Sequence, residues 1–139
     1  MIAGKLHVRA VEERIVEAAR KSLEAFPGVV LPIIGGRYKG GDFADLRPAL
    51  EGRTRGVITI GESAPRIEEA LADVVPVARA VSMDDAVRQA FRLATSGDTV
   101  VLAPACSSFD MFGSFAERGR AFKEAVARLG GENAGGREP

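Results

Sequence analysis

The amino-acid sequence predicts an open α/β fold: a mainly parallel sheet of about four strands with helices on both faces, preceded by an N-terminal helix. Short, continuous apolar runs carry this prediction, because they are typical of strands buried on both faces of a parallel sheet. They alternate with longer stretches whose apolar residues recur at intervals of three and four, which is helical spacing. The length of 139 residues fits one domain, expected at residues 1–130, with a flexible tail at 131–139.

The composition excludes several classes of protein. Lys and Arg together number 19, as do Asp and Glu, so we expect neither nucleic acid nor a membrane as a partner. One cysteine excludes an internal disulfide and, with one histidine, a metal site rich in these residues. No apolar run reaches the ~20 residues of a membrane span. The first residues lack the apolar stretch of a signal peptide, so the expected location is cytoplasmic.

The N-terminal segment is expected to form one helix over residues 8–26. Its apolar residues fall on one face at helical spacing, and Pro27-Gly28 ends it. A buried strand is expected at 29–34, although Pro32 suits an edge strand better than a central one.

The rest of the chain alternates strands and helices in the same way. Asp42 is expected to cap a helix in two pieces, and Ser82 a later helix. Gly130-Gly131 is expected to end the last helix. The expected strands are residues 56–60, 74–78 and 99–103, and the expected helices are residues 43–53, 65–71, 83–96 and 115–129.

Ligands of open parallel sheets bind beyond the carboxyl ends of the strands. The loop at residues 35–43, Gly-Gly-Arg-Tyr-Lys-Gly-Gly-Asp-Phe, follows the first buried strand. Its glycines let backbone amides approach an anion, and Arg37 and Lys39 add positive charge, so a carboxylate or phosphate site is one interpretation. The alternative is that the glycines only turn the chain and Lys39 is solvated. The spacing matches neither the dinucleotide-binding pattern nor the P-loop pattern.

A second loop, residues 104–112, follows the last expected strand. The hydroxyl groups of Ser107-Ser108 suit a carboxylate ligand. Cys106 is either a nucleophile or a buried, inert thiol, and the lack of a nearby histidine favours the second. Asp110 is either a base or a brace of the loop. No chemistry is expected at 61–65, and no catalytic residue or metal ligand is assigned.

A series of segments, taken in order, matches one family of domains. The segments are residues 33–43 (IIGGRYKGGDF), 46–50 (LRPAL), 60–67 (IGESAPRI), 97–102 (GDTVVL), 104–112 (PACSSFDMF) and 115–122 (FAERGRAF). Over about residues 24–129, they resemble the Rossmann-like C-terminal domain of the Mur ligases. The resemblance is to those members that join D-glutamate to UDP-N-acetylmuramoyl-L-alanine in peptidoglycan biosynthesis.

The resemblance implies an enzyme of three domains, of which the central P-loop domain binds ATP and Mg²⁺ and the C-terminal domain brings D-glutamate. ATP phosphorylates the substrate carboxylate, and the amine of D-glutamate attacks the acyl phosphate. By resemblance, Lys39 contacts one carboxylate of D-glutamate and Ser108 the other. Phe109 lies beside Ser108, and Phe115 lines the pocket. No cofactor is expected in this chain. The residues expected to support the loop are Gly35, Gly36, Gly40 and Asp42.

The N-terminal segment departs from the family pattern. The family domain begins with Pro-His-Arg and continues into a strand that ends in Asp-Ser-Lys-Ala-Thr-Asn, a motif that contacts nucleotide and D-glutamate. Residues 6–9 faintly echo the first pattern, and the second is absent. A helical segment at residues 1–27 is therefore expected in place of the family's first strand.

Three hypotheses about function follow. The first is the D-glutamate-binding domain of an ATP-dependent ligase, not catalytic alone, with the missing ligase domains as partners in trans. The second is a stand-alone amino-acid-binding or interaction module derived from that domain. The third is a domain of a related ligase, such as the folate-polyglutamate type, which the loop at 104–112 fits less well.

Overall fold

The protein folds as a parallel α/β layer structure, seen in a computed structural model that describes residues 6–10, 15–106 and 112–134. Five strands form one sheet in the order β1-β5-β2-β3-β4, and every neighbouring pair is parallel. The predicted fold class is confirmed, with one strand more than expected. The strands are β1 (His7–Ala10), β2 (Val30–Gly35), β3 (Val57–Ile60), β4 (Val77–Arg79) and β5 (Thr99–Leu102). The helices are α1 (Val16–Ala25), the 3-10 helix η1 (Phe43–Leu46), α2 (Arg47–Leu50), α3 (Ala64–Leu71), α4 (Met83–Leu93) and α5 (Phe115–Ala134).

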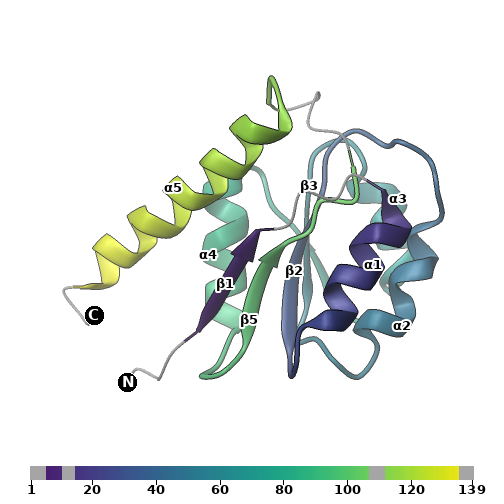
Figure 1. Cartoon of the computed structure of the whole chain (residues 1–139), viewed down its shortest axis with the longest axis horizontal. Coiled ribbons are helices and arrows are strands. Elements are labelled where there is room, and N and C mark those ends of the chain that lie inside the picture. The colour runs from purple at the N-terminus through teal and green to yellow at the C-terminus, as the bar shows by residue number, and fades with distance from the viewer. Residues whose placement is uncertain (1–5, 11–14, 107–111, 135–139) are drawn as a thin grey trace.

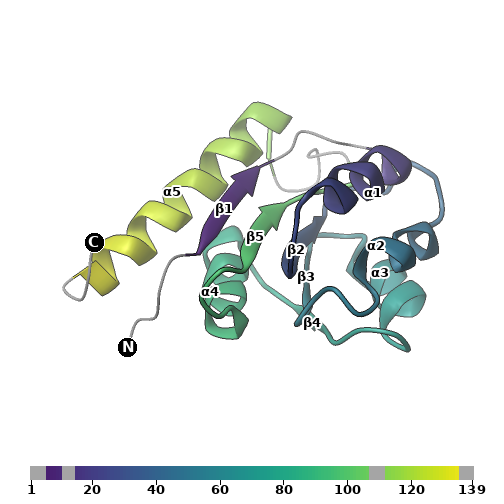
Figure 2. The ribbon, with the colours of Figure 1, turned by 60° about the horizontal axis from the view of Figure 1, so that its bottom comes forward.

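Helices cover both faces of the sheet. α1, α2 and α3 lie on one face, and α4 and α5 lie on the other (Figure 1); the view in Figure 2 shows the same separation. Successive residues of a strand point to opposite faces, so each central strand contributes to two cores. Ile34 and Val101 pack in the core under α1, α2 and α3, whereas their neighbours Ile33 and Val100 pack in the core under α4 and α5.

The structure corrects the prediction for the N-terminal segment. β1 pairs with β5, from His7↔Thr99 to Ala10↔Leu102, where a helix was expected. Among the described residues of the expected helix, 16–25 are helical, as α1, and Ile15 on its predicted apolar stripe is 63% exposed. A backbone partner distant in sequence decides the conformation here. Residues 5–10, Lys-Leu-His-Val-Arg-Ala, do alternate polar and apolar side chains as a strand does, but the helical spacing of residues 8–26 outweighed this signal in the prediction. The expected replacement of a strand by a helix is therefore wrong, although residues 10–15, Ala-Val-Glu-Glu-Arg-Ile, still lack the family motif.

Pro32 lies in β2, a central strand, although a proline was expected to favour an edge. The Val30 N–H, on the same side of the strand, donates to Arg53 O at 2.9 Å. The pairing of β2 with β3 begins only at Ile33↔Ile58. Pro32 therefore falls between two attachments, where its missing N–H costs no bond of the β2–β3 ladder.

The predicted helix caps are present. Asp42 Oδ1 accepts a hydrogen bond from Ala44 N at 2.9 Å, at the start of η1. Ser82 Oγ accepts one from Asp85 N at 3.0 Å, at the start of α4. Each side chain satisfies an N–H group that has no partner within its own helix, which fixes where the helix begins.

Two boundaries differ from the prediction. β4 lies at Val77–Arg79 rather than at residues 74–78. α5 continues through Gly130-Gly131 to Ala134, so the helix end expected there is wrong; glycine in a helix costs about 1 kcal/mol but does not prevent it. Of the expected tail, residues 135–139 lie outside the described part of the chain. No helix among the described residues is long and apolar enough to cross a membrane.

One arginine ties α1 and α2 together at the amino end of the sheet. The Arg53 guanidinium donates hydrogen bonds to three main-chain carbonyl groups at the C-terminal ends of these helices and to one in the turn after α1. The three are those of Leu23, Phe26 and Ala49, and the fourth is that of Gly28. The last carbonyl groups of a helix have no partner within it, so a cation at this place satisfies them and also favours the helix dipole.

A buried carboxylate fixes the start of β5. Asp98 is 4% exposed and accepts hydrogen bonds from Arg55 Nε at 2.6 Å and from Thr95 N at 2.9 Å. Burial by itself would raise the pKa of this carboxyl. The hydrogen bonds from Arg55 and Thr95, with the charge of Arg55, outweigh burial and hold the pKa below its ordinary value.

Candidate functional site

The loop that leaves β2 crosses the end of β3 in close contact. Gly35 has φ +148°, and a Cβ atom at this position would lie 1.9 Å from Ile60 O. Gly36 has φ +135°, and its N–H donates to the same oxygen at 3.1 Å. Only residues without a Cβ allow this approach, so the two glycines hold the start of the loop against β3.

Ser63 joins this loop to the loop that follows β5. Its buried Oγ donates to Gly36 O at 2.6 Å, and its N–H donates to the same oxygen at 3.0 Å. Cys106 Sγ donates a weak hydrogen bond to Ser63 Oγ at 3.5 Å. The Gly35 N–H donates to Pro104 O at 3.0 Å. The loops after β2, β3 and β5 are therefore bound to one another at the carboxyl edge of the sheet.

The loop after β5 has a fixed, buried beginning. Cys106 is fully buried, as the interpretation of a buried thiol expects. Its carbonyl oxygen accepts a hydrogen bond from Arg118 Nη1 of α5 at 2.9 Å. Ala105 has φ +57°, a left-handed conformation that costs a residue other than glycine about 1–2 kcal/mol. Strain of this kind is concentrated in loops that carry function.

Lys39 is exposed in the first loop, which the Tyr38 hydroxyl closes by donating to Gly41 O at 2.7 Å. Arg37 pairs with Glu62 on the surface, with 3.4 Å between Nε and Oε1. Lys39 has no hydrogen bond or ion pair within the described part of the chain. The loop thus presents one cation whose charge is not neutralised by a neighbour there.

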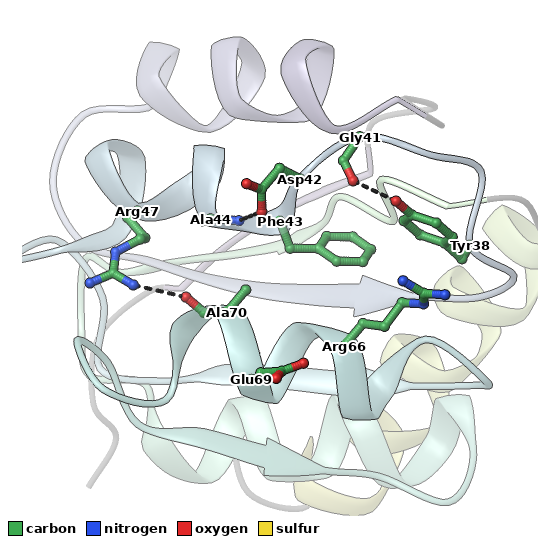
Figure 3. Close-up of a pocket in the computed structure, with 9 residues that line it drawn as sticks. All are labelled: Tyr38, Gly41, Asp42, Phe43, Ala44, Arg47, Arg66, Glu69 and Ala70. Carbon is green, nitrogen blue, oxygen red and sulfur yellow. Dashed lines mark hydrogen bonds between the residues drawn. The ribbon is translucent and has the colours of Figure 1, made fainter.

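A cavity of about 470 Å³ lies beside this loop, between η1 and α3 (Figure 3). The ring of Phe43 and the side chain of Ala70 provide apolar wall, and Arg47 stands at one end. Arg47 is held in place by Asp73, at 3.0 and 3.1 Å. The other residues around the cavity are Tyr38, Gly41, Asp42, Ala44, Arg66 and Glu69.

The structure describes only some of the site residues that were expected from the sequence. The described members, Lys39 with Gly35, Gly36, Gly40 and Asp42, all belong to the loop after β2.

The other expected members follow β5 in the sequence. Ser108 and Phe109 lie outside the described residues, as do Ser107 and Asp110. Phe115 is the first residue of α5, and its side chain is not among those described.

Sequence reasoning missed three residues that hold this site. No chemistry was expected from residues 61–65, yet Ser63 ties two loops together. Tyr38 and Arg66 are in contact, with the guanidinium carbon 4.0 Å from the ring centroid. The role of Ser63 could have been suspected from the sequence, because its hydroxyl follows shortly after β3, at the carboxyl edge of the sheet. The contact between Tyr38 and Arg66 has no signal in the sequence, because it joins the loop after β2 to α3, two segments far apart in the chain.

The described residues contain no group of three or more His, Cys, Asp or Glu side chains that could hold a metal ion. What they offer is a cation, glycine-rich backbone and a set of tied loops at the carboxyl ends of three parallel strands. The fold and the site thus define a parallel α/β domain with its candidate ligand-binding edge at the place typical of this class.

Within that class the chain belongs to one family, because residues 12–106 match the family described as Mur ligase, glutamate ligase domain. It is 49% identical over 114 residues to UDP-N-acetylmuramoylalanine--D-glutamate ligase of Solibacter usitatus, an alignment that covers 82% of this chain and 26% of that protein. The protein of the same name from Pseudomonas aeruginosa is 47% identical over 102 residues, covering 73% of this chain and 23% of its own length. The chain therefore spans about a quarter of the curated relatives that it matches.

One solved structure supports the fold independently of these sequences. It is a domain of a Haemophilus ducreyi protein named as a candidate UDP-N-acetylmuramate:L-alanyl-gamma-D-glutamyl-medo-diaminopimelate ligase. The TM-score is 0.57 at 14% identity, and the match covers 90% of this chain and 95% of that one. At this identity the likeness concerns the fold alone.

Proposed function

We propose that this chain is the D-glutamate-binding domain of an ATP-dependent ligase that joins D-glutamate to UDP-N-acetylmuramoyl-L-alanine in peptidoglycan biosynthesis. The observation that carries the proposal is the position of Lys39, exposed on a glycine-rich loop at the carboxyl edge of the sheet, in a chain up to 49% identical to enzymes of that name. A lysine here supplies a positive charge to one carboxylate of the amino acid.

The second carboxylate of D-glutamate is assigned to the loop after β5, with Ser108 as donor and with Phe109 and Phe115 beside the ligand. The supporting observation is that this loop is tied to the Lys39 loop through Ser63, Gly36 and Cys106. Two loops held in one frame suit a ligand with a carboxylate at each end, because the distance between its two contacts is then set before binding.

The chain's own part in the reaction is to hold and orient D-glutamate, so that its amine faces the acyl phosphate formed elsewhere in the ligase. ATP and Mg²⁺ belong to the central domain of the enzymes that it resembles, and the sequence given contains no P-loop motif. We propose that this chain does not catalyse ligation alone, that the missing ligase domains complete the site, and that the reaction takes place in the cytoplasm.

An amide NMR titration with D-glutamate, with L-glutamate as the comparison, tests the proposal. Saturable shifts around Lys39 and Ser108 for the D-isomer are expected. Lys39→Ala should weaken binding by about 1–3 kcal/mol, the cost of losing a charged hydrogen bond, or roughly 5- to 150-fold in Kd. Lys21→Ala, which removes an exposed lysine from α1, is the matched control and should leave the Kd unchanged. Equal affinity of Lys39→Ala and Lys21→Ala would contradict the site.

The alternative is a stand-alone amino-acid-binding or interaction module. Residues 10–15 favour it, because Ala-Val-Glu-Glu-Arg-Ile stands where the family has a motif that contacts the ligand. Absence of shifts with millimolar D-glutamate would support this alternative. Light scattering then decides whether the module associates with itself: a clean monomer at high concentration argues against self-association.

A further inference from the structure

Lys39 lies in a segment of loop with little packing of its own. Gly40 has φ +103° and Gly41 has φ +91°, so two residues of high backbone freedom follow the lysine directly. A Cβ atom at Gly40 would meet nothing within 4 Å, whereas one at Gly41 would lie 3.2 Å from Val16 Cγ2, so the loop is open beside Lys39 and packed against α1 at Gly41. A contact that joins the Lys39 segment to this packed point would let the lysine meet a ligand at smaller entropic cost.

That contact comes from Tyr38. Its hydroxyl donates to Gly41 O at 2.7 Å, across the two residues between them, and so closes the segment that carries Lys39 (Figure 3). The tyrosine ring is anchored in turn. It lies 5.9 Å from the Phe43 ring, centroid to centroid, at an interplanar angle of 52°, which is a favourable tilted pair.

Arg66 fixes the ring from a second direction. Its guanidinium carbon lies 4.0 Å from the centroid of the Tyr38 ring, well within the range of a cation–π interaction. Arg66 belongs to the first turn of α3, the helix that begins directly after Ser63. Ser63 holds Gly36 at the start of the loop that carries Tyr38. The beginning of α3 therefore holds the loop at two points, on either side of Arg37.

We propose that Tyr38 is a positioning residue for Lys39: its hydroxyl and its ring, the latter held by Arg66 and Phe43, preorganise the loop that presents the lysine to the carboxylate of the ligand. The inference rests on the proposed function, because it takes D-glutamate as that ligand. Tyr38 itself is assigned no contact with the ligand. It acts by reducing the conformational freedom that Lys39 loses on binding.

Tyr38→Phe tests the inference, since it removes the hydrogen bond to Gly41 and keeps the ring on Phe43 and Arg66. Without ligand, we expect faster amide hydrogen exchange and lower NMR order parameters at Lys39, Gly40 and Gly41. With D-glutamate, we expect Kd to rise by about 2- to 10-fold, which is the factor that one neutral hydrogen bond contributes. The urea midpoint should change little, because the bond lies on the surface.

Thr54→Val is the matched control. The Thr54 hydroxyl donates to Gly56 O at 3.0 Å and accepts from Gly56 N at 3.1 Å in a loop at the opposite end of the sheet. This variant therefore loses bonds between a hydroxyl and the main chain, two rather than one, away from the site. It should leave Kd and the order of the Lys39 loop unchanged. Arg66→Met is the second variant, and it should loosen the same three amides by releasing the ring.

The two proposals fail in different measurements. Lack of D-glutamate binding by the unchanged protein refutes the proposed function, and the positioning role is lost with it. Binding by the unchanged protein with the same Kd for Tyr38→Phe overturns the positioning role alone. The positioning role is also overturned if the Lys39, Gly40 and Gly41 amides are as ordered in Tyr38→Phe as in the unchanged protein, because the hydrogen bond to Gly41 then does not order the loop.

Discussion

Replacing Gly35 by alanine tests whether the close approach between the loop after β2 and the end of β3 is as tight as the geometry requires. The new Cβ atom would lie 1.9 Å from Ile60 O and 2.8 Å from Ile60 C and N, all of them backbone atoms. A methyl group cannot stay there, and backbone cannot rotate away as a side chain can. The pair Gly35↔Ile60 at the carboxyl end of the β2–β3 ladder must therefore separate.

The cost has two sources. Displacement of Gly35 away from Ile60 breaks or lengthens two hydrogen bonds. They run from Gly36 N to Ile60 O at the end of β3 and from Gly35 N to Pro104 O after β5, and each is worth about 1 kcal/mol. Alanine is also strained at φ +148°, by about 1–3 kcal/mol. We expect Gly35→Ala to lower the free energy of unfolding by about 3–5 kcal/mol, which is a large share of the 5–15 kcal/mol typical of a domain.

Urea unfolding followed by circular dichroism measures this loss, with Gly28→Ala as the matched control. Gly28 also has positive φ, +76°, but a Cβ atom there would meet nothing within 4 Å. The control therefore carries backbone strain without the clash, and should cost about 1–2 kcal/mol. Equal losses for the two variants would refute the reasoning, because they would show that the end of β3 yields to a methyl group at no cost.

Two further predictions concern the amino end of the sheet. Arg53→Met leaves four carbonyl groups in α1, in α2 and in the turn after α1 without their donor and should lower the free energy of unfolding by about 2–4 kcal/mol in urea. Arg47→Met loses the exposed pair with Asp73 and one hydrogen bond to Ala70 O and should cost less; an equal or larger loss would contradict the assignment. The lowered pKa of Asp98 means that its contribution to stability is present above the unfolded value of 3.8 and is lost as the pH falls below it. Asp98→Asn should therefore flatten the decline of the urea midpoint below about pH 4, and the same decline in both proteins would contradict this.

Local sequence signals were sufficient for the central elements of the fold. The apolar runs that became β2, β3 and β5 are short, continuous and bounded by glycine or proline, which are properties of the segment itself. The caps at Asp42 and Ser82 are likewise local, since each side chain bonds an N–H two or three residues ahead. These features could be predicted because no distant partner decides them.

The remaining elements depend on distant partners. β1 pairs with the backbone of β5, and its sequence was ambiguous: residues 5–10 alternate polar and apolar side chains as a strand does, while Val8 also fits the helical spacing that continues through α1. Only the partner strand decides between the two. For the same reason the place of the candidate site could be predicted and its construction could not. The loops follow from the strand ends, whereas the bond from Ser63 to Gly36 and the contact of Arg66 with Tyr38 arise only when the sheet has brought β2 and β3 together.

The construction of the edge also bears on the segment after β1, where the family motif is missing. The bonds that hold the other loops run from Gly35 to Pro104, from Ser63 to Gly36 and from Cys106 to Ser63, and they involve the ends of β2, β3 and β5 only. β1 is an edge strand beyond β5 and takes no part in them. The frame that presents Lys39 therefore does not depend on β1. Under the proposed function, ligand affinity rather than stability is then the property in which this chain should differ from family members that keep the motif.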